Sequence, residues 1–322
     1  HYWDRETVSL RAITFQTIDD MNVEERAFRA GQLHVTESLL PAKIAAYRER
    51  EDPALVIAPW LATYYYLFNV RPLDDPEAEA PPRAAVLDVR VRKALALALD
   101  RRQITEAVTR GGQPVATTFT PPGTNGYQPG PGLSHDPGRA RELLAAAGYP
   151  DGEGFPEIEL LYNTSDNHRM IAEAVQQMWA RELGIGVRLN NVSWKEVLRR
   201  RREGGFTLIR AGWIADYPDP ETFLTNFLSD SGLNHSGWAN EEYDRLLRAA
   251  NEAPTLEERF AHLRAAEAIL LDAAPLIPVY HYTRIHLKRP EVKGWPTNRL
   301  AQVNYKFLRI EKTDTKGGEA AP

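Results

Sequence analysis

The chain has 322 residues, of which 43% are apolar and 26% are charged, and its formal net charge is −5. This length suggests about two domains, and the mild negative charge argues against nucleic acid as a partner, because no face-wide basic excess can neutralise phosphates. No apolar run is long enough to cross a bilayer, and the absence of cysteine excludes disulfides and thiolate metal sites.

The first 70 residues alternate between predicted strands and helices. Period-two patterning favours strands, and apolar spacing of three to four residues favours helices. The expected elements are a strand at 8–15, a helix at 22–29, a strand at 33–35, a helix at 41–50, and strands at 55–58 and 61–68. The last strand carries Tyr64, Tyr65 and Tyr66, so the outer two tyrosines share one face. These tyrosines either pack in the core or form an aromatic surface that contacts a ligand.

The middle of the chain begins with a Pro- and acid-rich stretch, 71–88, interpreted as an exposed loop. Asp88, Asp100 and Asp136 are expected to cap three helices, with an irregular loop at 113–135. The following pattern predicts a strand at 158–162, a helix at 168–183, a strand at 184–189, a helix at 194–202 and a strand at 206–210. This alternation indicates an α/β layer with parallel pairing.

The last third contains two amphipathic helices. One starts at Asn240, and the other starts with the capping box Thr255 to Glu258. Two strands, at 276–287 and 304–310, and a flexible tail at 316–322 complete the predicted elements. The basic run 199–202 lies near a predicted helix C-terminus, where a solvated basic face is the ordinary interpretation.

The stretch from Ile209 to Tyr217 is the most informative segment for function. It places one carboxylate, Asp216, in an apolar and aromatic setting, six residues after Arg210 at the end of a predicted strand. A buried carboxylate needs a cation or several hydrogen bonds. Either Asp216 binds a ligand ammonium while Arg210 binds a ligand carboxylate, or the two side chains pair with each other. The local sequence leaves both alternatives open.

Catalytic and metal-binding signatures are missing from the sequence. The eight histidines show no His-Glu-x-x-His spacing, and His281 and His286 are interpreted as ordinary histidines of a strand. There is no nucleophile elbow, no phosphate-binding loop and no dinucleotide fingerprint. We therefore expect no enzyme activity, no metal and no cofactor. A hydrolase that uses Asp216 and His168 is the enzyme alternative.

Several segments resemble one family. They are His1 to Asp4, Trp60 to Tyr66, Asp88 to Leu95, Leu160 to His168, Ala211 to Tyr217 and Ile277 to Tyr280. Together and in this order they resemble the extracytoplasmic solute-binding proteins that serve ABC importers of oligopeptides and dipeptides. The oligopeptide-binding subgroup is the most similar, because Tyr-Asn-Thr-Ser-Asp-x-His and Arg-Ala-Gly-Trp-x-Ala-Asp-Tyr both occur.

The resemblance implies an α/β, periplasmic binding protein-like fold of type II, in which two lobes close over a ligand like a Venus flytrap. Residues 1–66 and 283–322 would belong to the first lobe, which is partial, and residues 67–282 would form a complete C-terminal lobe. Family members carry a long N-terminal part with a signal peptide, and the sequence lacks it. The expectation is therefore a C-terminal portion, produced by cleavage, by a split gene or by truncation.

The resemblance also implies ligand-binding residues in an interlobe cleft. Asp216 would receive the α-ammonium of a peptide, and Arg210, Arg201 and His168 would meet its C-terminal carboxylate. The aromatic residues expected to line the cleft are Trp194, Trp213, Tyr64, Tyr66 and Tyr282.

The implied function is binding of oligopeptides and their delivery to an ABC importer permease, in the periplasm or another extracytoplasmic place, with any lipid anchor in the absent N-terminal part. A separate N-terminal fragment would be a further partner. Alternative ligands are a dipeptide, haem, a metal complex, or a signalling or cell-wall peptide. The remaining alternative is a fragment that is inactive without its N-terminal part.

Overall fold

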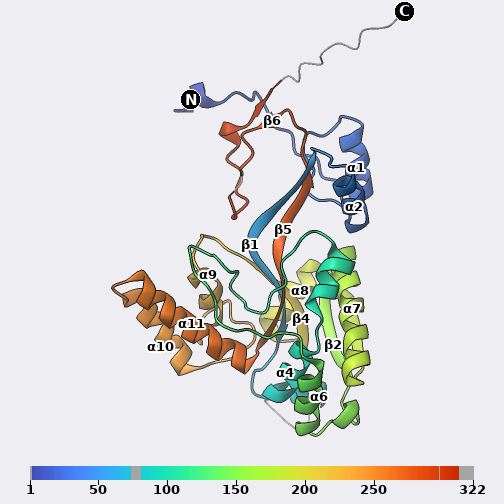
Figure 1. The fold of residues 1–322 in the computed structure, drawn as a ribbon, viewed down its shortest axis with the longest axis vertical. Coiled ribbons are helices and arrows are strands. Elements are labelled where there is room, and N and C mark those ends of the chain that lie inside the picture. The colour runs from blue at the N-terminus through green and yellow to red at the C-terminus, as the bar shows by residue number, and fades with distance from the viewer. Residues whose placement is uncertain (1, 74–80, 297, 312–322) are drawn as a thin grey trace, which may run out of the picture. The chain divides into compact units, whose positions relative to one another are not determined.

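The computed structural model describes residues 2–73, 81–296 and 298–311 (Figure 1). Contacts divide the chain into two compact units, residues 1–60 with 283–322, and residues 61–282. The sequence-based lobe boundary after residue 66 remains a prediction, and the contact boundary falls six residues earlier, within strand β1 (Leu55–Phe68). The expected tail at 316–322 and part of the expected 71–88 loop lie outside the described residues.

A mixed five-stranded sheet with the order β3-β2-β4-β1-β5 organises unit 61–282. Its strands are β1, β2 (Ile158–Asn163), β3 (Val187–Val192), β4 (Leu208–Ile214) and β5 (Leu276–Leu287). The predicted parallel pairing is confirmed for β2 with β3 and β4, whereas β1 runs antiparallel to β4. β1 is one continuous strand, and the two shorter strands expected at 55–58 and 61–68 are its halves.

Helices cover both faces of this sheet. They are α3 (Pro81–Leu87), α4 (Val89–Leu97), α5 (Arg101–Gln103), α6 (Pro137–Ala146), α7 (Asp166–Leu183), α8 (Trp194–Glu203), α9 (Glu221–Leu224), α10 (Glu241–Glu252) and α11 (Leu256–Ala273). Short 3₁₀ turns lie at η3 (Pro150–Gly152) and η4 (Thr225–Phe227), and α5 continues into a π-helical segment, η2 (Ile104–Thr109). The expected caps are confirmed, because Asp88, Asp100, Asp136, Asn240 and Thr255 all accept backbone N–H groups of the first turn. The expected loop at 71–88 is wrong at its end, where α3 begins at Pro81.

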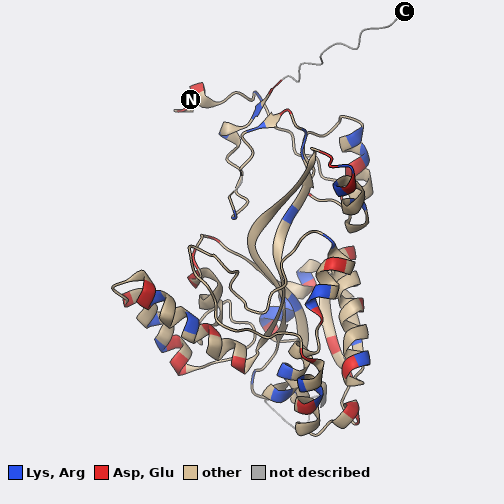
Figure 2. Cartoon of the chain, viewed as in Figure 1, with Lys and Arg blue, Asp and Glu red and all other residues tan. Residues whose placement is uncertain are grey.

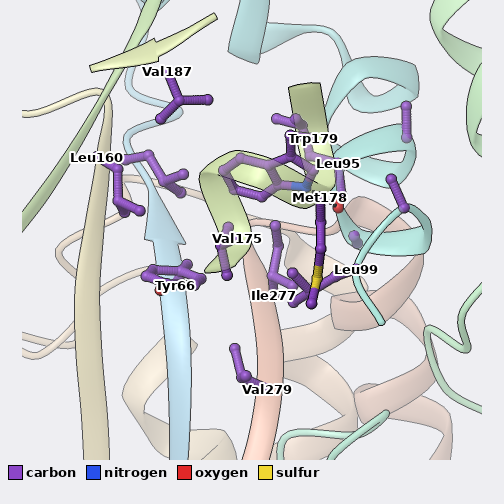
Figure 3. Close-up of a cluster of buried hydrophobic side chains, with 14 of the residues drawn as sticks. Tyr66, Leu95, Leu99, Leu160, Val175, Met178, Trp179, Val187, Ile277 and Val279 are labelled. Atoms are coloured by element: carbon purple, nitrogen blue, oxygen red, sulfur yellow. Dashed lines mark hydrogen bonds between the residues drawn. The ribbon is translucent and has the colours of Figure 1, made fainter. Parts of the chain in front are cut away.

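The main core lies between the sheet and α7. Figure 3 shows Val175, Met178 and Trp179 of α7 gathered with Tyr66 of β1 and Ile277 of β5. All five are essentially inaccessible to solvent. The indole N–H of Trp179 donates to the Leu95 carbonyl at 2.8 Å, so this large side chain is buried without an unpaired donor.

The opposite face of the sheet is covered by the loop 113–135 and by α9 to α11. Tyr65 packs edge-on against Phe119 at a centroid distance of 5.0 Å, and Phe119 in turn contacts Phe223 and Phe227. The tyrosine prediction is therefore confirmed in its geometry, since Tyr64 and Tyr66 face α7 whereas Tyr65 faces this loop.

The unit formed by residues 1–60 and 283–322 has a smaller core. Its elements are η1 (Arg5–Thr7), α1 (Met21–Arg29), α2 (Pro41–Glu49), β6 (Val292–Lys293), η5 (Tyr305–Phe307) and β7 (Arg309–Ile310). Phe28, Ile44, Tyr47 and Leu287 are among its buried residues. Buried Glu25 of α1 accepts from Lys43 and Tyr47 of α2, each at 2.9 Å, so its charge is paired.

Several strand predictions are wrong in this unit and at β3. Residues 8–15 form no strand, 33–35 contributes only the isolated bridge Val35–Lys288, and 304–310 contains η5 and the two-residue β7. The strand expected at 184–189 begins at Val187, because Gly184 ends α7 in the left-handed conformation at φ 67°. Alternating apolar residues form a strand only where a partner strand accepts their hydrogen bonds.

Charges of both signs are interspersed on α7, α10 and α11 (Figure 2). In the part of the chain that the structure describes, no three His, Cys, Asp or Glu side chains gather as metal ligands would. A search of the same residues finds no helix with the length and apolar character of a membrane span.

Candidate ligand-binding site

Arg210 is the centre of a partly buried polar cluster in unit 61–282. It lies in the middle of β4, directly opposite Tyr66 of β1, and not at the strand end that the sequence predicts. Its Nη2 donates to the Tyr282 hydroxyl at 2.6 Å, and Nη1 reaches Asn163 Oδ1 at 3.4 Å. The guanidinium carbon lies 4.8 Å from the centre of the Tyr64 ring, in cation–π range.

The partners of Arg210 are therefore neutral. Among the described residues it forms no ion pair, and its Nε atom is buried without a hydrogen-bond partner. A guanidinium stays protonated at every accessible pH, so a full positive charge resides in this cluster. Buried charges are ordinarily paired, and an anion that enters the cluster would meet an unneutralised cation.

His168 lies in the first turn of α7 and joins the same cluster. Its ring centre is 5.6 Å from that of Tyr64. Burial, and then the positive charge of Arg210, lowers the pKa of His168 to about 3. The imidazole is neutral at pH 7, and its Nδ1 atom is buried without a partner among the described residues, as are the hydroxyls of Tyr64 and Tyr66.

Gly212 leaves room for the contact between Arg210 and Tyr282. A Cβ atom at this position would lie 3.1 Å from the Tyr282 hydroxyl and 3.4 Å from Arg210 Nη2. Gly212 lies opposite Tyr64 on β1, so the side chain of any larger residue would contact the Arg210 cluster. Tyr280 belongs to the same cluster, since its ring stacks on that of Tyr64 at a centroid distance of 4.8 Å. The sequence alone did not single out Gly212, Asn163 or Tyr280. The alternation of Tyr280 with Tyr282 along β5 is the signal that could have identified Tyr280.

Asp216 differs from its prediction. It is exposed, not buried, and follows the end of β4 by two residues. It makes no hydrogen bond or ion pair with the described residues, and Arg210 pairs with Tyr282 and Asn163 instead. The alternative in which Asp216 and Arg210 neutralise each other is therefore wrong. Because Asp216 lies beyond the last residue of the strand, its carboxylate stays in solvent in spite of the apolar neighbours in the sequence.

The other predicted residues lie outside the contacts of this cluster. Trp213 points to the opposite face of β4, and its indole N–H reaches Thr222 Oγ1 at 3.4 Å. Trp194 opens α8 and is 51% exposed. Arg201 lies near the end of α8, within electrostatic range of Tyr65, and its buried Nε has no partner among the described residues.

The basic run of α8 is divided between paired and unpaired members. Arg199 pairs with Glu196 at 2.6 Å and with Glu203, and Arg200 pairs with Glu196 at 2.9 Å. These two residues fit the solvated face expected from sequence. Arg201 and Arg202 form no ion pair among the described residues, so both have charge available to a ligand, and Arg201 also has a buried Nε atom without a partner.

Comparison with known proteins identifies the relatives of this chain. The family model "Bacterial extracellular solute-binding proteins, family 5 Middle" matches residues 1–235. The periplasmic murein peptide-binding protein MppA of Escherichia coli is 38% identical over 312 residues, which are 95% of this chain and 56% of that protein. The chain thus spans little more than half the length of this relative.

Solved structures agree with this match. The structure of the Escherichia coli murein tripeptide binding protein MppA has a TM-score of 0.85 at 36% identity, covering 97% of this chain and 60% of that chain. Haemophilus influenzae OppA in complex with the peptide RPPGFSPFR has a TM-score of 0.83 at 31% identity, covering 97% and 60%. The expected periplasmic binding protein-like α/β fold is confirmed, with about three fifths of the relatives' chains represented.

Proposed function

Because this chain belongs to the family 5 bacterial extracellular solute-binding proteins, we propose that the intact protein binds peptides outside the cytoplasm and delivers them to the permease of an ABC importer. Members of the family are solute-binding proteins, not enzymes, and the relatives described above are named for binding peptides. The partly buried charge of Arg210, which no described carboxylate neutralises, is the observation that carries the proposal.

A peptide terminus fits the cluster around Arg210. The cluster offers a fixed positive charge, two free N–H or imidazole positions at Arg210 Nε and His168 Nδ1, and no competing carboxylate among the described residues. A carboxylate accepts from a guanidinium more strongly than a phenol or an amide does. We therefore assign Arg210 and His168 to the C-terminal carboxylate, with Tyr64, Tyr66 and Tyr282 holding Arg210 in place.

Asp216 supplies the opposite charge. Its carboxylate has no partner in the described part of the chain, and a peptide ammonium would provide one. Ile214, the last residue of β4, lies four positions after Arg210, which is about 13 Å at a rise of about 3.3 Å per residue, and Asp216 follows two positions later. An extended peptide of a few residues has a similar length. Arg201, Trp194 and Trp213 are assigned to contacts with longer ligands or with ligand side chains.

The test is a cycle of two changes measured by calorimetry on the intact protein. Asp216→Ala is expected to weaken binding of an unmodified tripeptide about 10- to 100-fold, from about 1.5–3 kcal/mol for a hydrogen bond to a charged group. N-acetylation of the peptide is expected to weaken binding to the unaltered protein by the same factor and to change binding to the Asp216→Ala variant little. Equal binding of free and acetylated peptides, or an unaffected Asp216→Ala variant, would contradict the assignment.

A second candidate ligand is a murein peptide, because MppA is named for murein peptide binding and is 38% identical. A competition experiment between murein peptides and linear oligopeptides of the same length separates the two. Preference for the murein peptide by more than about tenfold, or about 1.4 kcal/mol, would replace the oligopeptide as the assigned ligand.

A further inference from the structure

Arg259, in the first turn of α11, binds two carboxylates of the segment that follows β4. Its Nη1 and Nη2 donate to the two oxygens of Asp219 at 2.9 and 2.8 Å, and Nη2 also reaches Glu221 Oε2 at 3.2 Å. The other oxygen of Glu221 accepts from Asn251 of α10 at 2.9 Å. This network, Arg259–Asp219–Glu221–Asn251, joins both helices of the α10–α11 pair to the segment that carries Asp216.

The network is built differently from the exposed ion pairs of the chain. The side chains of Arg259, Asp219 and Glu221 are 18%, 20% and 24% exposed, whereas those of Arg245 and Glu242 on α10 are 61% and 52% exposed. Two parallel N–H···O bonds between a guanidinium and a carboxylate fix relative orientation as well as distance. An exposed pair with flexible side chains contributes little to stability.

The segment Asp216–Tyr217–Pro218 is held at both ends. Before it, the Ala215 N–H donates to the Leu61 carbonyl at 2.9 Å, which ties it to the β1–β4 ladder. After it, Asp219 is fixed by Arg259, and the Asp219 N–H donates to the Tyr217 carbonyl at 2.9 Å. An exposed carboxylate binds a ligand charge well only if its backbone is already fixed, since ordering it on binding would cost affinity.

We propose that Arg259 is a positioning residue for the ligand ammonium: it holds the Asp216 segment in its binding conformation through Asp219. The inference rests on the proposed function, in which Asp216 receives the peptide ammonium. Arg259 itself touches no ligand. Its guanidinium is committed to Asp219 and Glu221, so its effect on affinity passes through the backbone of residues 216–219.

The alternative is a purely structural role, in which Arg259 only braces α11 against α9. The two roles differ in their effect on the pH dependence of binding. The ammonium of a free peptide has a pKa of about 7.7–8.0, and pairing with a carboxylate raises it in the complex. Affinity is therefore constant well below this pKa and falls about tenfold per unit once the pH is above about 8, until the pH reaches the pKa of the bound amine. If Asp216 is misplaced, it raises the pKa of the bound amine less, so the affinity falls less as the pH rises.

The groups around Asp216 do not titrate in the same range. Burial, followed by the charges of Glu221 and Asp219, raises the pKa of Tyr217. The hydrogen bonds to Asp219 raise the pKa of Arg259 above its ordinary value. Tyr217 thus stays neutral and Arg259 stays charged between pH 7 and 9.5. A change in the pH dependence of affinity within this window therefore reflects the pairing of the peptide ammonium with Asp216.

The experiment measures tripeptide affinity by calorimetry between pH 7 and 9.5 for the intact protein and five variants, one of which is Asp216→Asn. Arg259→Gln and Asp219→Asn are expected to weaken binding at pH 7 about tenfold, in the range of coupled neighbours, and to flatten the fall at high pH. Arg259→Lys keeps the charge but loses the second N–H···O bond, so the affinity of this variant should lie between those of the unaltered protein and Arg259→Gln. Arg245→Gln, which removes an exposed pair on α10, is the matched control and should leave both affinity and slope unchanged.

Outcomes distinguish the inference from the proposed function. If Asp216→Asn retains full affinity, the proposed function fails irrespective of Arg259. If Asp216→Asn weakens binding but Arg259→Gln and Asp219→Asn both keep the unaltered affinity and slope, the positioning role is refuted and the proposed function stands. Weakening by Arg259→Gln with an unchanged slope also refutes it, in favour of a structural brace. Should Arg259→Gln fail to fold, Asp219→Asn, which keeps the Arg259–Glu221 pair, distinguishes the same two roles.

Discussion

Glu267 of α11 offers the sharpest test of the energetics of this fold. It is completely buried, with one oxygen accepting from the Thr120 N–H at 2.7 Å and the other from the Tyr127 hydroxyl at 2.8 Å. It thereby fastens the loop 113–135 to α11. Burial raises the pKa of Glu267 to about 7 in spite of the two hydrogen bonds, and no cation forms an ion pair with it among the described residues.

The raised pKa makes stability depend on pH in a defined direction. In the unfolded chain Glu267 titrates near 4.5, and in the folded protein near 7. Between these values the folded state binds the extra proton, so the stabilisation is complete below pH 4.5 and is lost as the pH rises through 7. A difference of about 2.5 units at 1.36 kcal/mol each is about 3 kcal/mol.

Glu267→Gln is expected to remove this pH dependence. The amide can accept from the Thr120 N–H with its oxygen and donate to the Tyr127 oxygen with its nitrogen, so both contacts survive without a buried charge. The variant should match the unaltered protein near pH 4.5 and exceed it in free energy of unfolding by up to about 3 kcal/mol at pH 8.

Urea unfolding at pH values from 5 to 8, followed by circular dichroism, measures this difference. Buried histidines act in the opposite direction, because burial lowers the pKa of His286 to about 4, but they are common to both proteins and cancel. Glu257→Gln, on the exposed face of the same helix, is the control and should leave the profile unchanged. Parallel stability profiles for the unaltered protein and Glu267→Gln would refute the reasoning.

Two further predictions concern the Arg210 cluster. Gly212→Ala places a methyl group 3.1 Å from the Tyr282 hydroxyl, so it should weaken peptide binding about threefold to tenfold by disturbing one hydrogen bond. The control Gly232→Ala, whose methyl group meets nothing within 4 Å, should leave peptide affinity unchanged. Equal affinities of the two variants in calorimetry would contradict this. Arg210→Ala should weaken binding of short peptides more than long ones, because a longer peptide places its carboxylate beyond Arg210. Equal losses across a series of peptide lengths would argue against that dependence on length.

The parts of the fold that the sequence predicted are those set by local chemistry. Asp88, Asp136 and Thr255 cap helices because their side chains accept N–H groups two or three residues ahead, whatever packs above them. The orientation of Tyr64, Tyr65 and Tyr66 follows from the two-residue period of a strand. Neither inference requires knowledge of a distant partner.

The parts that could not be predicted depend on distant partners. Residues 8–15 alternate as a strand would, yet no described strand pairs with them. β4 extends to Ile214 because Ala62 and Thr63 of β1 supply a ladder beyond Arg210, and the apolar run at 206–210 does not show this. The network of Arg259 with Asp219 and Glu221 joins residues about forty positions apart, so no local pattern reports it.

The exchange of roles between Arg210 and Asp216 follows from the extension of β4. Had the strand ended at Arg210, the arginine would stand at the sheet edge and Asp216 would fold back over apolar neighbours. Because the ladder continues to Ile214, Arg210 is placed opposite Tyr66 inside the sheet, where long aliphatic and planar groups can pack against Tyr64. The Asp216 carboxylate lies past the end of β4 in solvent, so the fold pays no desolvation cost for it. The cation thus bears the burial cost in the folded chain. Under the proposed assignment the Asp216 carboxylate loses its water only in the complex, so we expect Arg210→Ala to change both stability and affinity, and Asp216→Ala to change affinity alone.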